Sequence, residues 1–366
     1  MKALLMGHIA SDEFPAPYFE SYLEERYRKQ GVFFGLWAWR NVLQMDTYYG
    51  PINPDLMPTK FLEQYDIIFV VGIKTLPSYP FPDGENRCAW LKKNFPHVKV
   101  VLMSDLGESF YSNRTFNNPN PNSYERIRSQ IESADVFLQL CWAYMDEFKQ
   151  FLKLDNIYSI EPIDFEEYQY WFERMPKYER KRNLIAVTRH NESSHENLRR
   201  MMGTTQTIKL TNPTVDYRFF SNIDQKDLNI ESYNKYQWTF NQVFSDIKPV
   251  QIADRYFADL NQCGIFVDNV CCSSAGPRMA FHSAMLEIPP VANTGLTEHL
   301  FPELSIPPVK WITDAWDNNL WAEKVTRLLT NDKWYTEMSK LVHKRLWDLC
   351  RPDAVKEQLL QVLNLK

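Results

Sequence analysis

The chain has 366 residues, of which 44% are hydrophobic and 24% charged, and its formal net charge is -5. A chain of this length usually builds more than one hydrophobic core, so we expect two domains of ordinary size. The acidic balance excludes a global positive field that would attract nucleic acid, while the basic groups at 180–182 and 199–200 leave a local basic patch open.

The cysteines and the first residues indicate the cellular compartment of the protein. Six cysteines occur without a CxxC motif or paired spacing, which favours neither a disulfide framework nor a zinc site. The opening MKALLMGHIASDE is too short for the apolar part of a signal peptide, and no run reaches the roughly 18 apolar residues of a membrane span. We expect a reduced, cytoplasmic protein, with peripheral membrane contact left open.

Strands and helices alternate through the first half. The run DIIFVVGI at 66–73 is rich in β-branched residues and is typical of a strand covered on both faces. Alternation of this kind predicts a parallel sheet with helical crossovers. The expected strands are 3–7, 32–39, 66–73, 99–104 and 136–140, and the expected helices are 17–30, 86–95 and 123–133.

A charged, aromatic and proline-bounded segment interrupts this rhythm before a second series begins. Its expected strands are 183–188, 207–210, 264–267 and 290–293, and its expected helices are 195–202, 250–261, 278–286 and most of the last fifty residues. We predict an α/β protein of two doubly wound, Rossmann-like domains facing a cleft. The N-terminal domain would be 1–162, the linker 163–182 and the C-terminal domain 183–366.

Polar residues follow two strands of the first half. His8, Asp12 and Glu13 come after the first strand and could meet an acceptor, although loop polarity alone also explains them. Asp105 follows the strand KVVLMS, where a carboxylate could accept a proton from a bound hydroxyl. The alternatives are that Asp105 caps a helix or turn, or that Glu108 takes the role of base.

The first strand of the second half leads into a basic, serine-rich segment. Arg189 and His195 stand where a strand ends and a helix begins, which suits an anionic group. Ser193 and Glu196 also match a capping box, which by itself would explain those two residues.

A similar segment follows the strand GIFVD. Ser273, Ser274 and Gly276 precede a helix whose first turn holds Arg278, and a cation there opposes the helix dipole unless an anion is bound. The alternative is an Arg278 that faces solvent at small cost. His282, inside the same helix, is either a ligand contact or an ordinary core histidine.

These features resemble the glycosyltransferases of the GT-B fold, in which two Rossmann-like domains face each other and the C-terminal one binds a nucleotide sugar. Retaining members carry a motif like EAMAxGxPV, followed by a glycine and an acidic residue. Residues 283–298, SAMLEIPPVANTGLTE, are similar to it, which implies that Glu298 belongs to the donor site. Ser283 or His282 stands where those members have a ribose-binding glutamate.

A second resemblance is to the phage DNA β-glucosyltransferases of T4 type, which are inverting GT-B enzymes. VVLMSDLGESF resembles their base segment, which implies that Asp105 is the base. TRHNESSHENLRR resembles their diphosphate loop, which implies contacts from Arg189 and His195, and Arg278 and His282 correspond loosely to a late arginine and glutamate. The resemblance implies metal-independent transfer from a UDP-sugar without a cofactor, with a hydroxymethylated base in DNA as acceptor.

Other functions remain open at this stage. The acceptor could be a cell-surface glycan or a small molecule, because nothing in the chain decides between a glycan and DNA. A nucleotide-sugar epimerase can have the same fold and needs no acceptor. A two-lobed solute-binding protein and an interaction scaffold are the non-enzymatic alternatives. The sequence contains no DxD motif, which would indicate a metal-dependent transferase.

Overall fold

The structure is a computed structural model and describes thirteen segments of the chain. They are residues 1–6, 18–20, 36–49, 59–72, 86–104, 121–139, 145–163, 178–188, 195–221, 246–249, 253–268, 278–307 and 316–365. The chain divides into two compact units. The first unit is Met1–Phe165 together with Leu349–Lys366, and the second unit is Glu166–Asp348.

The described strands of the first unit form one sheet in the order β2-β3-β1-β4-β5-β6-β7. All neighbouring strands are parallel except β2, which is antiparallel to β3. The strands are β1 Ala3–Met6, β2 Tyr18–Glu20, β3 Asp46–Tyr49, β4 Ile67–Val71, β5 Lys99–Ser104, β6 Val136–Gln139 and β7 Ile157–Tyr158. The helices are α1 Leu36–Leu43, α2 Thr59–Leu62, α3 Arg87–Asn94, α5 Pro121–Ser133, α6 Met145–Leu152 and α15 Pro352–Val362.

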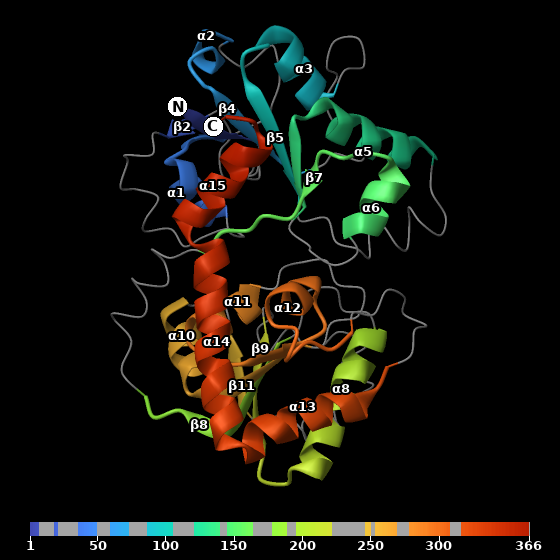
Figure 1. Ribbon diagram of the computed structural model, residues 1–366, viewed down its shortest axis with the longest axis vertical. Helices are drawn as coiled ribbons and strands as arrows, with labels where there is room; N and C mark the ends of the chain where they lie inside the picture. The colour runs from blue at the N-terminus through green and yellow to red at the C-terminus, as the bar shows by residue number, and fades with distance from the viewer. Residues whose placement is uncertain are drawn as a thin grey trace. The chain divides into compact units, whose positions relative to one another are not determined.

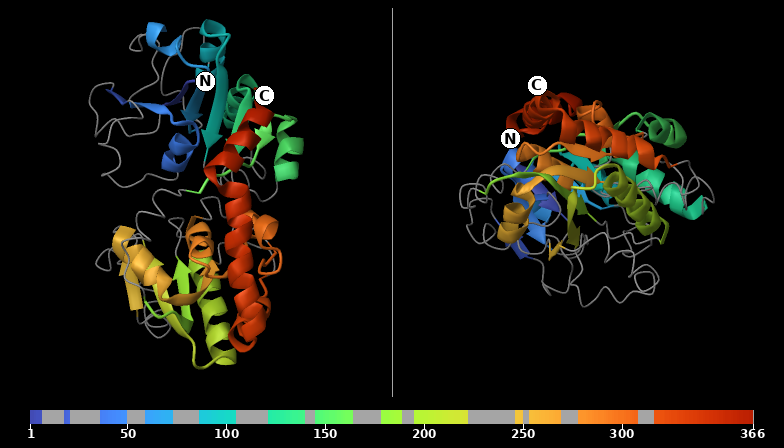
Figure 2. Two further views of the ribbon diagram at one scale, coloured as in Figure 1. Left: turned by 60° about the vertical axis from the view of Figure 1, so that its left-hand side comes forward. Right: turned by 90° about the horizontal axis from the view of Figure 1, so that it is seen from below.

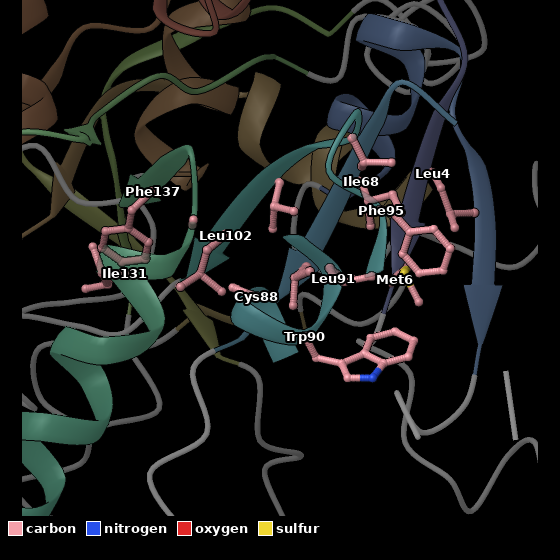
Figure 3. Packing of buried hydrophobic residues seen from close by; sticks show 14 of the residues in the cluster. Leu4, Met6, Ile68, Cys88, Trp90, Leu91, Phe95, Leu102, Ile131 and Phe137 are labelled. Carbon is pink, nitrogen blue, oxygen red and sulfur yellow. The ribbon is translucent and has the colours of Figure 1, made fainter. Parts of the chain in front are cut away.

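Both faces of this sheet are buried, which explains the continuous apolar run in β4. Ile68 belongs to a cluster that also contains Leu91 of α3 and Ile131 of α5, and Figure 3 shows this packing. Ile67 and Phe69 point to the opposite face, because successive side chains of a strand alternate. The expected strands at 3–7, 66–73, 99–104 and 136–140 are confirmed within a residue or two of each end.

The opposite face is covered by two helices that lie far apart in the sequence. Trp39 of α1 shares a buried cluster with Val355 and Leu359 of α15, and the two helices lie side by side in Figure 1. The assignment of all of 183–366 to one C-terminal domain is therefore wrong for residues 349–366, which pack with the first unit. Tertiary packing is the reason, because the apolar side chains of α15 pack against the sheet that the N-terminal residues form.

Two expectations for the N-terminal region are wrong where the structure describes them. Residues 18–20, expected to begin a helix, form the edge strand β2. Residues 36–39, expected to end a strand, begin helix α1. Trp39, Val42 and Leu43 are buried at helical spacing, so packing against α15 prevails over the strand preference of the aromatic residues.

The described strands of the second unit form a sheet with the order β10-β9-β8-β11-β12, and all of them are parallel. The strands are β8 Lys181–Thr188, β9 Asp216–Ser221, β10 Asp246–Pro249, β11 Cys263–Asp268 and β12 Pro290–Ala292. The helices are α8 His195–Thr211, α10 Ala253–Asn261, α11 Arg278–Met285, α12 Gly295–Leu300, α13 Asn318–Thr330 and α14 Asp332–Cys350.

Helix α8 is longer than expected, and the strand expected at 207–210 lies inside it. Thr207, the first residue of the expected strand, is hydrogen-bonded within the helix: its Oγ1 donates to Gly203 O at 2.8 Å, and Thr205 Oγ1 donates likewise to Met201 O at 2.9 Å. Helix α8 then packs along α13, beside which it lies in Figures 1 and 2. The other expected strands and helices of this half are confirmed, whereas β9, β10 and α12 were not predicted.

Candidate active site

The second unit has the strand order of a doubly wound dinucleotide-binding sheet. From the central strand β8, the chain adds β9 and β10 on one side and then β11 and β12 on the other. The direction of winding therefore reverses between β8 and β11, which pair in register with Val187 opposite Val267. Ligands of such sheets bind outside the carboxyl ends of the strands at this reversal.

Two helices begin after the strands that flank the reversal. Helix α8 begins at His195, shortly after β8, and helix α11 begins at Arg278, shortly after β11. The first turn of a helix offers backbone N–H groups without partners in the helix, and these groups attract anions. The topology thus places the starts of α8 and α11 at the same edge of the sheet.

Most of the predicted site residues lie outside the described part of the chain. They are His8, Asp12, Glu13, Asp105, Glu108, Arg189, Ser273, Ser274 and Gly276. The side chains of His195 and Arg278 lie outside it too, although their backbone is placed at the starts of α8 and α11. The strands that precede these residues are described, so the predicted positions at strand ends can be followed to Met6, Ser104, Thr188 and Asp268.

His282 lies on α11 and contacts α10. Its Nδ1 is 3.1 Å from the hydroxyl of Tyr256, and its ring lies 4.9 Å from that of Phe257, centroid to centroid. The side chain is half-buried. These contacts fix the ring within the α10–α11 packing and are those of a boundary histidine.

Glu298 lies apart from that packing, on the short helix α12. Thr294 caps this helix by accepting a hydrogen bond from Thr297 N at 3.2 Å, and Glu298 is exposed in the first turn. A carboxylate in the first turn complements the helix dipole without any ligand. The structure places α12 after β12, at the same edge of the sheet as the start of α11.

Asp268, the last residue of β11, was not predicted as a site residue. Its side chain is fully buried, and its carbonyl accepts a hydrogen bond from Asn293 N at 3.4 Å. Asp268 therefore links the ends of β11 and β12 directly beside the reversal of winding. The signal was available, because a carboxylate closes the otherwise apolar strand GIFVD.

The sheet of the first unit has its own reversal, between β1 and β4. Gly72, which follows β4, has φ +79° and donates from its N–H to Met103 O at 2.7 Å. Its left-handed backbone turns the chain away from the sheet at the carboxyl end of β4. The same hydrogen bond joins this turn to β5, the strand that precedes Asp105.

A second missed residue, Arg87, lies at this edge. It is the first residue of α3 and is 6% exposed. Its Nη1 donates to Val71 O at 3.4 Å and its Nη2 donates to Gly72 O. Arg87 shares with Arg278 the sequence signal of a cation in the first turn of a helix.

No group of three or more histidine, cysteine, aspartate or glutamate side chains in the described part of the chain lies close enough together to hold a metal ion. Among the helices of the described segments, none combines the length and apolar character that crossing a membrane requires.

The fold is that of an α/β protein with two parallel, doubly wound sheets, apart from the antiparallel edge strand β2. No protein-family model and no curated protein sequence matches the chain. Solved structures match it by fold. HepE from Anabaena in complex with UDP is 10% identical over 84% of this chain and 80% of its own, with a TM-score of 0.57.

Two further solved structures have the same fold. A point mutant of TarM from S. aureus, in complex with fondaparinux, alpha-GlcNAc-glycerol and UDP, is 12% identical over 76% of this chain and 58% of its own, with a TM-score of 0.51. The pneumococcal O-GlcNAc transferase GtfA in complex with UDP and GlcNAc is 11% identical over 75% of this chain and 54% of its own, at 0.50. The chain thus spans little more than half of TarM and GtfA, and it shares with them an α/β fold built on parallel sheets.

Proposed function

We propose that the chain is a glycosyltransferase that moves a sugar from a UDP-sugar to an acceptor hydroxyl. The observation that carries this proposal is the parallel sheet of the second unit, whose winding reverses between β8 and β11 at the starts of two helices. The fold is shared with HepE, TarM and GtfA, each solved with UDP. We propose the second unit as the donor half and the first unit as the acceptor half.

The donor diphosphate would bind at the start of α11. The backbone N–H groups near Ser274 and Gly276 would meet its oxygens, and Arg189 and Arg278 would neutralise its charge. Arg278 opens α11, which supports this role because a cation there is stabilised when an anion is bound between it and the helix. His195 at the start of α8 and Ser273 would complete the diphosphate contacts.

Glu298 and His282 are proposed at the sugar and ribose side of the donor. Glu298 is exposed at the edge of the sheet reached by β12, which supports a donor contact. The Nδ1 of His282 lies 3.1 Å from the Tyr256 hydroxyl, and this contact holds the imidazole ring in place.

The reaction would be a direct displacement with inversion at the anomeric carbon. Asp105 would accept the proton of the acceptor hydroxyl as its oxygen forms the new bond to that carbon. The bond from the carbon to the diphosphate oxygen breaks, and its electron pair leaves with UDP. The cationic and N–H groups would stabilise that charge, so the mechanism needs neither a metal ion nor a cofactor.

The acceptor would bind over the first unit. His8, Asp12, Glu13 and Glu108 are the proposed contacts. The first three follow β1, which flanks the reversal, and Glu108 follows β5, the strand beyond β4. A hydroxymethylated base in DNA and a glycan are both compatible with a hydroxyl nucleophile. A cytoplasmic setting fits the buried free thiols of Cys88, Cys263 and Cys350.

The proposal is tested with UDP and UDP-sugars. Calorimetry should show that UDP binds and that other nucleoside diphosphates bind more weakly. Incubation with UDP-glucose and UDP-GlcNAc, with and without hydroxymethylated duplex DNA or an oligosaccharide, should release UDP only when an acceptor is present. Release of UDP in chelator, with a product anomer opposite to the donor, would support metal independence and inversion. Conversion of the donor sugar without acceptor would instead identify an epimerase, and absence of UDP binding would overturn the proposal.

A further inference from the structure

The guanidinium of Arg87 is buried at the carboxyl edge of the first sheet. Its two donor nitrogens Nη1 and Nη2 face the carbonyls of Val71 and Gly72, the last residue of β4 and the one after it. β4 flanks the reversal of winding in this sheet, which is where ligands of doubly wound sheets bind. The charge therefore lies at a ligand-binding position rather than within ordinary core.

The positive charge of Arg87 has no compensating carboxylate in the described part of the chain. Burial and the neighbouring Cys88 are the influences on the pKa of Arg87, and burial, the larger, lowers it. Burial also raises the pKa of the Cys88 thiol to about 12, so Cys88 is neutral and provides no counter-charge. Because arginine keeps its proton in proteins, a buried cation remains, and a buried charge without an opposite charge is costly.

One N–H donor of the Arg87 guanidinium also makes no hydrogen bond to the described residues. Among the described residues, the buried Nε–H of Arg87 meets no acceptor. Arg180 makes a contrast, because its Nε, Nη1 and Nη2 all donate, to Asn261 O at 3.4 Å, Glu287 O at 3.2 Å and Leu286 O at 2.6 Å. Both arginines bind carbonyls at the ends of elements, but only Arg87 retains a buried N–H that could bind a further acceptor.

We infer that Arg87 anchors an oxyanion site that holds a phosphate or carboxylate group of the acceptor. An oxyanion would accept a hydrogen bond from Nε–H and neutralise the guanidinium in one contact. The first turn of α3 favours a negative charge at the same place. The hydrogen bond from Gly72 N to Met103 O joins this site to β5, so the charged group would be held one strand from Asp105. The inference rests on the proposed function, because it takes the first unit as the acceptor half.

The test observes the Nε–H directly in the full chain. Arginine labelled with ¹⁵N at Nε gives one resonance per ordered side chain, and the Arg87 resonance is the one missing from Arg87→Lys. Inorganic phosphate and acetate are titrated separately at constant ionic strength. The Arg87 resonance should shift with saturation, and Arg87→Gln should weaken binding of the same anion by at least about tenfold. A tighter response to phosphate assigns a phosphorylated acceptor, and a tighter response to acetate assigns a carboxylate.

Arg180→Gln is the matched control, since it removes a carbonyl-binding arginine without a buried spare N–H. It should leave the phosphate and acetate titrations unchanged. UDP affinity should be the same in the wild type and in Arg87→Gln, because UDP is proposed to bind the second unit. If the Arg87 resonance moves with neither anion, the inference is overturned. This result is measured on the wild-type protein, and Arg87→Lys is needed only to assign the resonance. If the anion site responds but UDP does not bind, the donor proposal fails and the oxyanion site stands.

Discussion

The hydroxyl of Tyr256 and the Nδ1 of His282 lie 3.1 Å apart, and this contact joins helix α10 to helix α11. The rings are also in edge contact, with centroids 5.6 Å apart. His282 lies about one turn after the start of α11, where we propose that the donor diphosphate binds. Its hydrogen bond therefore affects both the packing of the second unit and the placement of that helix.

Tyr256→Phe removes the hydroxyl and keeps the ring. We expect the free energy of unfolding to fall by about 1 kcal/mol, because a half-buried hydrogen bond is lost while the aromatic contacts remain. Urea denaturation followed by circular dichroism measures this change. His282→Gln is the companion variant, and combining it with Tyr256→Phe should cost less than the sum of the two. Full additivity would show that the two side chains do not act together.

Gly264 in β11 has no room for a side chain. An added Cβ would lie 2.4 Å from Arg182 Cα and 2.7 Å from Arg182 O, both backbone atoms of the neighbouring strand β8. Gly264→Ala should therefore lower the free energy of unfolding by about 1–3 kcal/mol or prevent folding, since the two strands must separate.

Gly203→Ala is the control for that variant. The added Cβ would lie 3.1 Å from Asn318 Nδ2, a side-chain atom that can move, and alanine is about 1 kcal/mol better than glycine inside a helix. We expect a change within about 1 kcal/mol in either direction. Equal losses from both glycine variants would contradict the close approach of β8 and β11.

Glu303 and Arg345 make the stability of the second unit dependent on pH. The guanidinium of Arg345 donates to both carboxylate oxygens of Glu303, at 2.7 and 2.8 Å, and these bonds hold the pKa of Glu303 below its usual range. A carboxyl whose pKa is lowered by folding contributes stability above its unfolded pKa of about 4.3. That contribution is lost as the pH falls through the lower, folded pKa.

The measurement is the melting temperature between neutral pH and pH 3, for the wild type and for Glu303→Gln. The variant should be less stable at neutral pH, and the gap should narrow toward acid. Asp348→Asn removes the exposed pair with Lys344 and should shift the melting temperature little at any pH, because exposed pairs contribute little. If the difference in melting temperature between the wild type and Glu303→Gln stays constant with pH, the lowered pKa of Glu303 is not the source of the pH dependence.

Asp105→Asn tests the proposed base. The amide cannot accept the acceptor proton, so transfer should fall by about 10²–10⁴-fold, while UDP affinity stays within error of the wild type. Single-turnover assays with the best donor and acceptor measure the first quantity, and calorimetry measures the second. Glu108→Gln is the comparison: if it abolishes transfer while Asp105→Asn retains it, Glu108 is the base.

The sequence predicted the interior of the fold better than its margins. β4 and β11 were recognised because strands buried on both faces carry unbroken apolar runs. The change from apolar to polar residues also marks the ends of β5 at Ser104 and of β11 at Asp268. The helix at 36–43 was missed, and α8 was predicted too short, because both depend on partners in α15 and α13 that no local pattern reveals. The candidate site was predicted from strand ends alone. Arg87 and Asp268 were missed although the sequence carries a signal for each, because only the structure shows that their side chains are buried.

The position of α15 has a consequence for how the chain is made. Its residues Val355 and Leu359 complete the core that Trp39 and Phe69 begin, and they are synthesised after the whole of the second unit. The second unit, by contrast, is one continuous segment, 166–348. Although domains usually fold in order of synthesis, the second unit should reach its native core first during translation. The rest of the first unit is translated earlier and would expose the apolar face under α15 to chaperones until α15 has been made.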